Sequence, residues 1–566
     1  MNAKRWTIAF VALALGGTAH ALTSEEIANA LDISPDIATF SLDGVSEWAI
    51  DTDIAHSGGS ALKSGFVSDP SWDGEWRSSD LIMTMDLKEA CWLSYWYKRS
   101  CYDYDEQVLE CLDNTIYANG GDQDWFNPRQ VLLPGRHVIK FSYQRRYGET
   151  DSGHGAWIDE MSLIPILPET AKVQVTDIKC QQRYPWNGMV DIDYTVESED
   201  PNAEVWVYPI GYDRDSNTSM APRSLTGDGV GSPVGNGTHR MTWTVTDDYP
   251  EFHSTAFTVK MIALTGAAPY MVIDLSGGVD ALSYPVSYLS SVPEGGWDDE
   301  YKTTKLVLRL IPPGSFMMGS PSDENGRGND EDWHAVVLTK PFYIGVFEVT
   351  QKQYELVMGA NPSYFRGDMR PVEQVSYDTI RGSVNGSAWP VHNQVDANSF
   401  MGRLRSKVNM LFDLPTEAQW EYACRAGTSS ALNSGKDYDW GANGSEVARW
   451  SLNSHDDGYD GKGGYEYTTK VGCYRENNWG VYDMHGNVAE WCRDYWNGGL
   501  GTTGVVDPVG ASTGWWNNEG ARVYRGGGCD DGIWETIRSA YRDYTCMSSS
   551  SYEIVGFRVF CSPVAE

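Results

Sequence analysis

The sequence predicts a multidomain protein in which two β-sandwich modules precede an α+β domain. Three observations lead to this fold class. The chain has 566 residues, which is too long for a single hydrophobic core, so about three domains are expected. Short apolar runs between Gly, Asp and Ser clusters fill the first half, as in antiparallel sandwiches. After about residue 291, helix-capping sequences appear beside aromatic and Gly-rich stretches.

Residues 1–21 have the order of a secretory signal peptide. A basic start at Lys4 and Arg5 precedes an apolar run over residues 6–15, and small residues at 19 and 21 then suit a signal peptidase. The apolar run is too short to span a bilayer, and no later segment is apolar enough to do so. We therefore expect an exported mature chain, periplasmic, cell-surface or secreted, with no transmembrane segment.

The strong negative charge limits the classes of partner. The chain has 43 Lys and Arg against 78 Asp and Glu, a formal net charge of -35 at pH 7. Such a surface repels phosphate backbones, so nucleic acid and anionic membranes are not expected partners. The charge fits either cation binding or a well-solvated exported surface, and the second explanation is the simpler one.

Ten cysteines are divided between the two halves of the chain. They are Cys91, Cys101, Cys111 and Cys180, then Cys424, Cys473, Cys492, Cys529, Cys546 and Cys561. Even counts in an exported chain allow disulfides within each half, although the spacing does not reveal the pairs. No close pair has the spacing of a zinc or redox motif. HExxH and P-loop motifs are also absent from the sequence.

Residues 22–168 predict a jelly-roll-like β-sandwich. The aromatic run Cys91–Tyr97 indicates a strand, and Val131–Phe141 is typical of a strand, a turn and a second strand. The order of Ser57–Leu62, Trp92–Tyr97 and Ala156–Met161 resembles exported bacterial jelly-roll modules. The Trp and Tyr side chains fit a sugar-stacking platform or a core between two sheets, and the pattern favours the core.

Residues 169–290 predict an immunoglobulin- or fibronectin-like β-sandwich. Val190–Val196 alternates apolar and polar residues, as in a strand with one solvated face. Met241–Val245 and Ala256–Met261 repeat this signal. No residues here are arranged for chemistry, so we interpret the module as a spacer that ends in a turn-rich, acidic linker over Val292–Glu300.

Residues 291–566 change to α+β character. Thr350, with Gln353 at the reciprocal capping position, predicts a helix that ends at Gly359. A second helix is expected from Thr416 to Gly427 by the same signals. Two short helices leave much of this domain irregular, which suits a functional surface built from loops.

A series of motifs runs through this third domain in a fixed order. They are Ile311–Ser320, Phe342–Thr350, Arg370–Val372, Leu414–Glu421, Trp479–Trp491, Arg525–Gly528, Arg538–Arg542 and Gly556–Arg558. Together they resemble the formylglycine-generating enzyme, or sulfatase-modifying factor, family over about residues 305–561. The resemblance implies a C-type-lectin-like α+β fold with little regular secondary structure.

The resemblance also implies a copper chemistry. The family's oxidases convert a cysteine of a client sulfatase into formylglycine, with copper held by two cysteine thiolates shortly after an Arg-Gly-Gly-Ser segment. Soft sulfur ligands favour Cu(I). In this chain the aligned positions are Asp531 and, nearby, Thr536, and Gly528 replaces the Ser. Cys529 is the only candidate catalytic residue, and it fits a disulfide or a plain loop residue better than a copper ligand.

A structural calcium loop is a further implication of the resemblance. The ligands implied are the carbonyl oxygens of His485, Gly486 and Val488 and the carboxylate of Glu490, which are hard oxygen donors of the kind that calcium prefers. The alternative is a metal-free turn in which Glu490 accepts from backbone donors. A second calcium loop falls near Asn453–Tyr459, around Asp456-Asp457-Gly458. Because no nucleophile or carboxylate stands beside His485 in the sequence, we expect a structural histidine.

Two function classes fit these observations, and the enzyme status stays open. A non-catalytic ligand-binding member is favoured, because the copper cysteine pair is not matched and two β modules precede the domain as in adhesins. The alternative is the oxidase that acts on exported sulfatases. A binding member would take a protein, peptide or carbohydrate ligand. Its expected contact residues are Arg525, Asp531, Trp534 and Tyr541.

A further alternative is a variable protein diversified by a retroelement. Some variable ligand-binding proteins of diversity-generating retroelements end in this fold, with a hypermutated stretch between Arg-Gly-Gly and Gly-Phe-Arg. Cys529–Glu535 and Cys546–Glu553 are rich in the residue types that mutated Asn codons yield. An adenine-rich near-repeat of this stretch should then lie close to the gene, and its absence would exclude this alternative.

Overall fold

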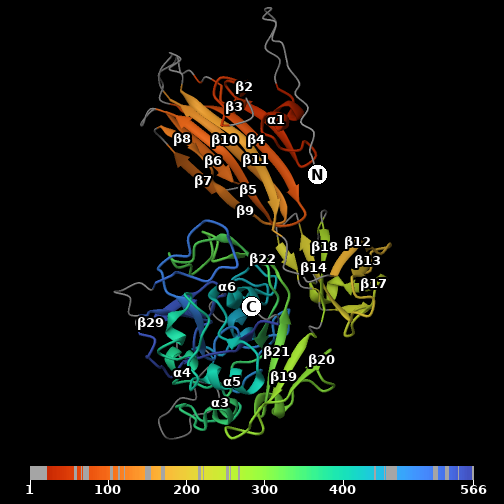
Figure 1. Ribbon diagram of the computed structural model, residues 1–566, viewed down its shortest axis with the longest axis vertical. Coiled ribbons are helices and arrows are strands. Elements are labelled where there is room, and N and C mark those ends of the chain that lie inside the picture. Colours follow the sequence, from red (N-terminus) through yellow and green to blue (C-terminus); the bar gives the residue numbers. More distant parts are fainter. Residues whose placement is uncertain are drawn as a thin grey trace, which may run out of the picture. The chain divides into compact units, whose positions relative to one another are not determined.

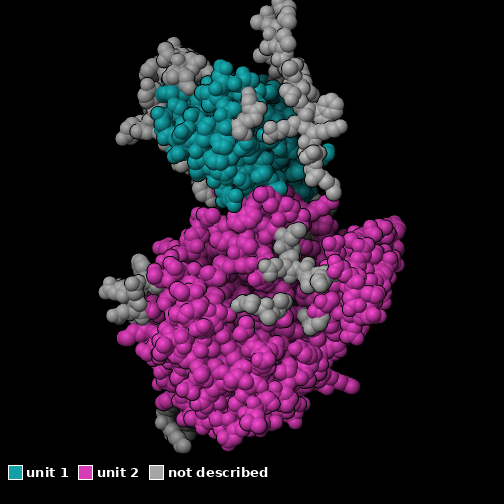
Figure 2. All heavy atoms as spheres, viewed as in Figure 1, with its two compact units in different colours: residues 1–86, 93–129, 136–163 teal, residues 87–92, 130–135, 164–566 magenta. Residues whose placement is uncertain are grey.

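The computed structural model describes most of the chain. It describes residues 22–56, 60–65, 67, 75–101, 106–112, 115–119, 122–146, 154–166, 173–213, 218–220, 222, 224–249, 254, 257–265, 268–438, 442–451, 453, 468–513, 520–529, 534–545 and 547–563. The predicted signal peptide, the loop Asp456-Asp457-Gly458 and Asp531 lie outside the described residues. The chain divides into two compact units (Figure 2), residues 1–86, 93–129 and 136–163 in unit 1 and residues 87–92, 130–135 and 164–566 in unit 2.

Unit 1 is a β-sandwich of two sheets (Figure 1), with strand orders β1-β4-β10-β6-β7 and β2-β3-β11-β5-β8. The short helix α1 (Ser24–Ala30) precedes them and starts at a capping box formed by Thr23 and Glu26. The strands are β1 (Ala38–Gly44), β2 (Ala49–Asp51), β3 (Ala61–Lys63), β4 (Arg77–Leu87), β5 (Cys91–Ser100), β6 (Glu106–Leu112), β7 (Thr115–Asn119), β8 (Gln123–Phe126), β9 (Arg129–Leu132), β10 (Gly135–Arg145) and β11 (Gly155–Pro165). The β-sandwich predicted for this part of the chain is confirmed.

The aromatic run in β5 contributes to both faces of its sheet. Tyr95 and Tyr97 are buried, whereas Trp96 between them is only partly buried. The ring of Trp96 stacks on His56, with centroids 3.7 Å apart. Because successive side chains of a strand point to opposite faces, the run divides between core and surface. Tyr95 and Tyr97 are therefore core residues, whereas Trp96 lies on the other face of the strand.

The second module, at the start of unit 2, is also a sandwich, with strand orders β12-β13-β17-β16 and β15-β14-β18. Its elements are β12 (Val173–Gln182), β13 (Met189–Ser198), β14 (Val205–Asp213), β15 (Thr218–Met220), β16 (Leu225–Gly227), β17 (Gly237–Thr244), α2 (Val245–Asp248) and β18 (Phe257–Thr265). Alternate residues of β13 are buried, as the alternating sequence predicts, and Ile192 and Tyr194 pack with Met261 in the core.

The rest of unit 2 has three sheets and short helices, in the strand orders β20-β19-β21-β24-β31-β25, β22-β23-β27 and β29-β28-β26-β30. The strands are β19 (Tyr270–Asp274), β20 (Val286–Leu289), β21 (Lys305–Ile311), β22 (Gly314–Met318), β23 (His334–Leu338), β24 (Phe342–Gly345), β25 (Phe412–Asp413), β26 (Ala489–Tyr495), β27 (Val505–Val506), β28 (Arg522–Arg525), β29 (Arg542–Thr545), β30 (Val555–Gly556) and β31 (Phe560–Cys561). The helices are η1 (Asp299–Lys302), α3 (Gln351–Met358), α4 (Tyr377–Arg381), η2 (Gly386–Ala388), α5 (Phe400–Val408), α6 (Glu417–Arg425), α7 (Ala442–Val447) and η3 (Trp534–Ile537).

The C-terminal sheet starts earlier in the chain than the pattern suggests. Strands β19 and β20 fall within the range 169–290 expected for the second sandwich, yet β19 pairs with β21 in antiparallel register. An alternating sequence identifies a strand but does not specify which sheet the strand joins. The same core cluster contains Tyr208 and Leu264 of the second module and Met271 of β19, so hydrophobic packing joins the two within unit 2.

The capping signals place the two expected helices. Thr350 and Gln353 form the capping box of α3, which ends at the left-handed Gly359 with φ 86°. Helix α6 starts at the equivalent box of Thr416, and its left-handed cap is Ala426, one residue before the expected Gly427. Both helix predictions are confirmed.

Two general features follow from the described residues. None of their helices is both long and apolar enough to cross a membrane. No disulfide joins two of their cysteines, so the pairing that the even counts suggest has no counterpart in the described part of the chain, which excludes Cys546.

Candidate functional site

The segment that the motifs single out lies on the sheet β29-β28-β26-β30. Arg525, at the end of β28, stands opposite Glu490 of β26 and opposite Arg542 of β29. Strand β30 runs parallel to β26 on its other side and brings Gly556 opposite Glu490. The sheet thus gathers the Arg-Gly-Gly-Gly, Asn-Val-Ala-Glu and Gly-Phe-Arg motifs, which are far apart in the sequence.

The glycine run after Arg525 is required by close packing. Gly526 and Gly527 have φ angles of 92° and 69°, in the left-handed region that favours glycine. A Cβ on Gly527 would lie 2.7 Å from the carbonyl oxygen of Thr536, and a Cβ on Gly526 would lie 3.1 Å from the Trp420 ring. The run therefore lets the chain that follows β28 pass between α6 and η3.

Gly528 and Cys529 continue this buried path. A Cβ on Gly528 would lie 2.8 Å from Cβ of Ile554, so Ile554 fills the space that the family's Ser needs. Cys529 has 0% exposure, and its backbone N–H donates to the carbonyl of Asn487 at 3.1 Å. Thr536, near the second expected copper position, is buried, and its hydroxyl has no hydrogen-bond partner among the described residues.

Arg525 belongs to a buried network of ion pairs. Its exposure is 0%, and its guanidinium donates to Glu417 at 3.0 Å and to Glu421. It also donates to the carbonyl oxygens of Ala540 and Ser539. Because the side chain is fully buried and both terminal guanidinium nitrogens donate inside the protein, this position does not support the expected contact of Arg525 with a ligand.

The carboxylates of this network titrate differently. Burial alone would raise the pKa of Glu417, but Arg542 and Arg525 lower it below its usual value. Arg542 donates to Glu417 at 2.6 Å. Asp494 accepts from the backbone N–H of Glu417 at 2.7 Å, and burial, followed by the negative charge of Glu417, raises the pKa of Asp494 to about 7. The charged groups of this network therefore pair with one another inside the domain and are not exposed to solvent.

Of the other expected contact residues, the structure describes the side chain of Tyr541 only. Trp534 is the first residue of η3, and its side chain lies outside the described residues, as does Asp531. Tyr541 is partly exposed, and its hydroxyl donates to Asp543 at 3.2 Å. The loop after β29 adds two side chains that the sequence interpretation missed, Met547 with 54% exposure and Tyr552 with 42%. Mixed composition was the only sequence signal for this loop.

In the predicted calcium loop, the Glu490 carboxylate is already paired. Its two oxygens accept from the Arg558 guanidinium, one of them at 2.6 Å, and the Trp420 indole N–H donates to it at 2.7 Å. Gly486 has φ 71° and donates its N–H to the carbonyl of Gly526. The loop as built would bind calcium through Glu490 only after release of Arg558, so the ligand set fits calcium poorly. Calcium stays a prediction.

His485 is a structural residue, as its sequence context predicts. Its Nδ1 lies 2.6 Å from the carbonyl oxygen of Ile537, and its Nε2 accepts from the backbone N–H of Asn433 at 3.0 Å. Burial lowers the pKa of His485 to about 4, which keeps the imidazole neutral near pH 7. Both nitrogens are used inside the core, and neither is available as a surface base.

Two buried carboxylates beside this loop were not singled out from the sequence. Glu348 accepts from the side-chain amide of Asn487 at 2.8 Å and from the backbone N–H of Val488 at 3.1 Å. Burial, with Asp483 and Glu490 nearby, raises the pKa of Glu348. Burial also raises the pKa of Asp483 to about 6. Nothing in the local sequence marks these residues, because their proximity arises only in the folded chain.

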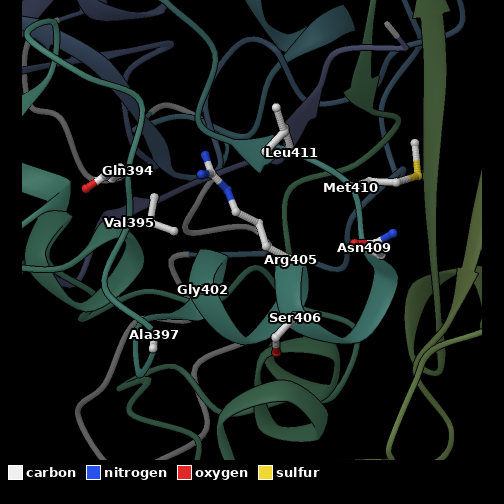
Figure 3. A pocket seen from close by; sticks show the side chains of 9 residues that line it. All are labelled: Gln394, Val395, Ala397, Gly402, Arg405, Ser406, Asn409, Met410 and Leu411. Carbon is white, nitrogen blue, oxygen red and sulfur yellow. The ribbon is translucent and has the colours of Figure 1, made fainter. Parts of the chain in front are cut away.

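A shallow cavity of about 480 Å³ lies over helix α5 (Figure 3). Arg405 extends from this helix toward the space between Val395 and Leu411. Its guanidinium donates to the carbonyl oxygens of Phe412 at 2.6 Å and Asn393 at 2.8 Å, and to the Asp413 carboxylate at 2.9 Å. Neither Arg525 nor Tyr541, the two expected contact residues whose side chains are described, lines this cavity, and its arginine is already engaged.

A family model and a curated relative point to the same protein family. The family model of the sulfatase-modifying factor enzyme 1-like domain matches residues 298–562. A formylglycine-generating enzyme of Streptomyces coelicolor is 36% identical over 298 residues, covering 45% of this chain and 89% of that enzyme. The chain belongs to the formylglycine-generating enzyme family. The third domain therefore has the C-type-lectin-like α+β fold that the motifs predict.

Two further similar proteins carry other names. Chaperone protein LppX of Paenibacillus barcinonensis is 33% identical over 214 residues, 33% of this chain and 71% of that protein. Among solved structures, Treponema denticola variable protein 1 aligns with 46% of this chain and 96% of its own, at 24% identity and a TM-score of 0.37.

Proposed function

We propose that this protein is a non-catalytic, ligand-binding member of the formylglycine-generating enzyme family. The observation that carries the proposal is the state of the Arg-Gly-Gly-Gly segment. Its single thiol, Cys529, is fully buried, and the two positions aligned with the copper cysteines are Asp531 and Thr536. One thiol does not supply the pair of soft ligands that Cu(I) requires.

The packing around the segment supports the same proposal. Ile554 occupies the space beside Gly528 that a serine side chain would need. Arg525 is held by Glu417 and Glu421 inside the domain. A site for oxidation must bring a client thiol to the metal, and the only described thiol of this segment, Cys529, is fully buried.

The exposed loop between β29 and β30 supports a binding role. Met547 and Tyr552 expose large apolar side chains there, and Tyr541 stands at the start of β29. Exposed aromatic and Met side chains commonly anchor protein partners. The name of the relative called chaperone protein LppX also shows that not every relative of this domain carries the name of an oxidase. The ligand would be a protein, peptide or carbohydrate.

The proposal is tested by incubating the purified full chain with copper and a cysteine-containing sulfatase-motif peptide. We expect the peptide thiol to persist and no aldehyde to form. A formylglycine-generating enzyme of Streptomyces coelicolor, run in parallel, controls for the peptide and the copper. Aldehyde formation by this chain that is lost in Cys529→Ser would establish the oxidase instead.

The retroelement alternative has its own test in the gene. If the stretch after Arg525 is diversified, a near-repeat of its coding sequence with adenines at the variable positions should lie nearby. A gene neighbourhood without such a repeat leaves a fixed binding protein as the explanation.

A further inference from the structure

A second cavity, of about 470 Å³, lies in unit 2 between the second module and the C-terminal domain. Trp206 and Tyr208 come from β14, Tyr270 from β19, and Trp297 and Trp479 from two loops. None of the described residues between Arg525 and Arg558 lines it. The cavity is therefore distinct from the segment on which the proposed function rests.

The aromatic walls are held rigidly by the cores behind them. Trp297 packs edge-on against Tyr270 and Tyr301, with ring centroids 5.1 Å and 5.0 Å apart. Trp479 packs in the same way against Tyr422, at 4.8 Å. Trp206 is partly buried against the core cluster that joins the two modules. Rings fixed in this way lose little entropy when a ligand binds.

Hydrogen-bond donors are left unused around these rings. The indole N–H groups of Trp206, Trp297 and Trp479 have no hydrogen-bond partner among the described residues, and each of these side chains is partly exposed. Arg309 donates through Nε to the carbonyl of Trp479 at 3.1 Å and through Nη1 to the carbonyl of Pro269 at 3.2 Å. These two bonds hold the guanidinium over the Tyr270 ring, 4.8 Å from its centroid.

The lining also carries acceptors and balanced charge. Asn478 donates from its amide nitrogen to the Tyr249 hydroxyl at 3.0 Å, which orients its amide oxygen as an acceptor. Glu476 brings a negative charge to the same lining as Arg309. A polyanionic ligand is disfavoured by this balance and by the chain's net charge of -35.

We propose that this cavity binds a neutral carbohydrate. A sugar ring presents an apolar C–H face to an aromatic side chain and a rim of oxygens to N–H donors, which is the combination that the lining offers. The volume lies within the usual range for small-ligand sites of about 300–1,000 Å³, which often form between domains. A peptide backbone has no apolar C–H face of the kind that a sugar ring lays on an aromatic side chain, so it is the weaker match.

The test uses the full chain in native affinity electrophoresis through gels that contain a neutral β-glucan, galactan, mannan or xylan. We expect retardation by at least one of them. Trp297→Ala and Trp206→Ala should each weaken the binding by about tenfold or more, because each removes an aromatic wall. Trp186→Ala is the matched control, since Trp186 is 46% exposed and does not line the cavity. Thermal melts of all variants confirm that they are folded.

Three outcomes would overturn the proposal. The first is no retardation by any of the four polysaccharides. The second is retardation that the folded Trp297→Ala and Trp206→Ala variants retain, which would place a sugar site elsewhere in the chain. The third is binding of a decaproline peptide, measured by calorimetry, that these variants lose while no polysaccharide binds. None of these outcomes depends on whether the Arg-Gly-Gly-Gly segment is catalytic.

Discussion

The Arg-Gly-Gly-Gly segment and the aromatic cavity differ in how far their hydrogen-bond donors are paired within the protein. In the segment, Arg525 donates to Glu417, Glu421 and two carbonyl oxygens within the domain. In the cavity, the indole N–H groups of Trp297 and Trp479 have no partner among the described residues. The first arrangement stabilises a fold, and the second is open to a ligand.

In the account proposed for this chain, the family's motif and the ligand site do not coincide. Arginine and glycine residues of the motif are retained here because the sheet and α6 pack around them. The chemistry of the family depends on two thiols, which the sheet does not need. The motif therefore identifies the fold, while the proposed carbohydrate binding rests on the aromatic groups of the cavity.

The largest expected effect follows from breaking the buried network. Arg525→Met leaves Glu417 and Glu421 without one of their cationic partners inside the domain, and we expect a loss of about 3–5 kcal/mol of unfolding free energy. Urea denaturation followed by tryptophan fluorescence measures it. Arg240→Met, which removes a solvent-exposed pair with Asp193, should leave the unfolding midpoint nearly unchanged. Equal midpoints for the two variants would mean that Arg525 is not committed to the fold.

A smaller effect is expected from restoring the family's serine. Gly528→Ser places a Cβ 2.8 Å from Cβ of Ile554, and such overpacking costs about 1–3 kcal/mol. The matched control is Gly235→Ser, because a Cβ at Gly235 meets no atom within 4 Å. If Gly528→Ser is as stable as the control, then Ile554 yields easily and the site is closer to the oxidases than the packing indicates.

The pH dependence of stability sharpens the account of the network. Burial raises the pKa of Asp494 to about 7, above its usual value of 3.8. Between these values the native state binds the extra proton, so stability falls as pH rises. Asp494→Asn removes this loss and still accepts from the Glu417 N–H. Its stability relative to wild type should therefore increase from pH 4 to pH 7.5, measured by urea denaturation at each pH. A difference that does not vary with pH would contradict the buried charge.

The smallest effect is expected from removal of calcium. Because Arg558 neutralises Glu490 and donates to both of its oxygens, EGTA should leave the melting temperature unchanged relative to a sample with added CaCl₂. Glu490→Gln, in contrast, should lower it in both samples, since Arg558 loses its buried counter-charge. A calcium-dependent rise in melting temperature would restore the loop of His485, Gly486, Val488 and Glu490 as the metal site implied by the resemblance.

Local signals in the sequence predict local structure well. The reciprocal caps at Thr350 and Thr416 place α3 and α6, and the alternation of Val190–Val196 places the buried face of β13. The assignment of β19 to the C-terminal sheet could not be predicted, because period-two alternation carries no information about pairing partners. The motif series identifies the family despite this.

The candidate site was predictable only where a motif marks it. The sequence itself shows that the positions of Asp531 and Thr536 hold no thiol. The burial of Arg525 could not be predicted, because an arginine followed by three glycines is typical of an exposed loop. Only the folded chain brings Glu417 and Glu421 of α6 to its guanidinium. The aromatic cavity is harder still, since Trp206 and Trp479 come from separate modules and meet only in the folded unit.

Titration of the reduced full chain with Cu(I), in competition with a chromophoric Cu(I) chelator, tests the central claim most directly. An intact cysteine pair would withdraw one equivalent of Cu(I) from the chelator. We predict that this chain withdraws none that is sensitive to Cys529→Ser, because Cys529 is buried and the aligned positions hold no thiol. Stoichiometric binding that is lost in Cys529→Ser would contradict the account and identify a copper site in a changed geometry.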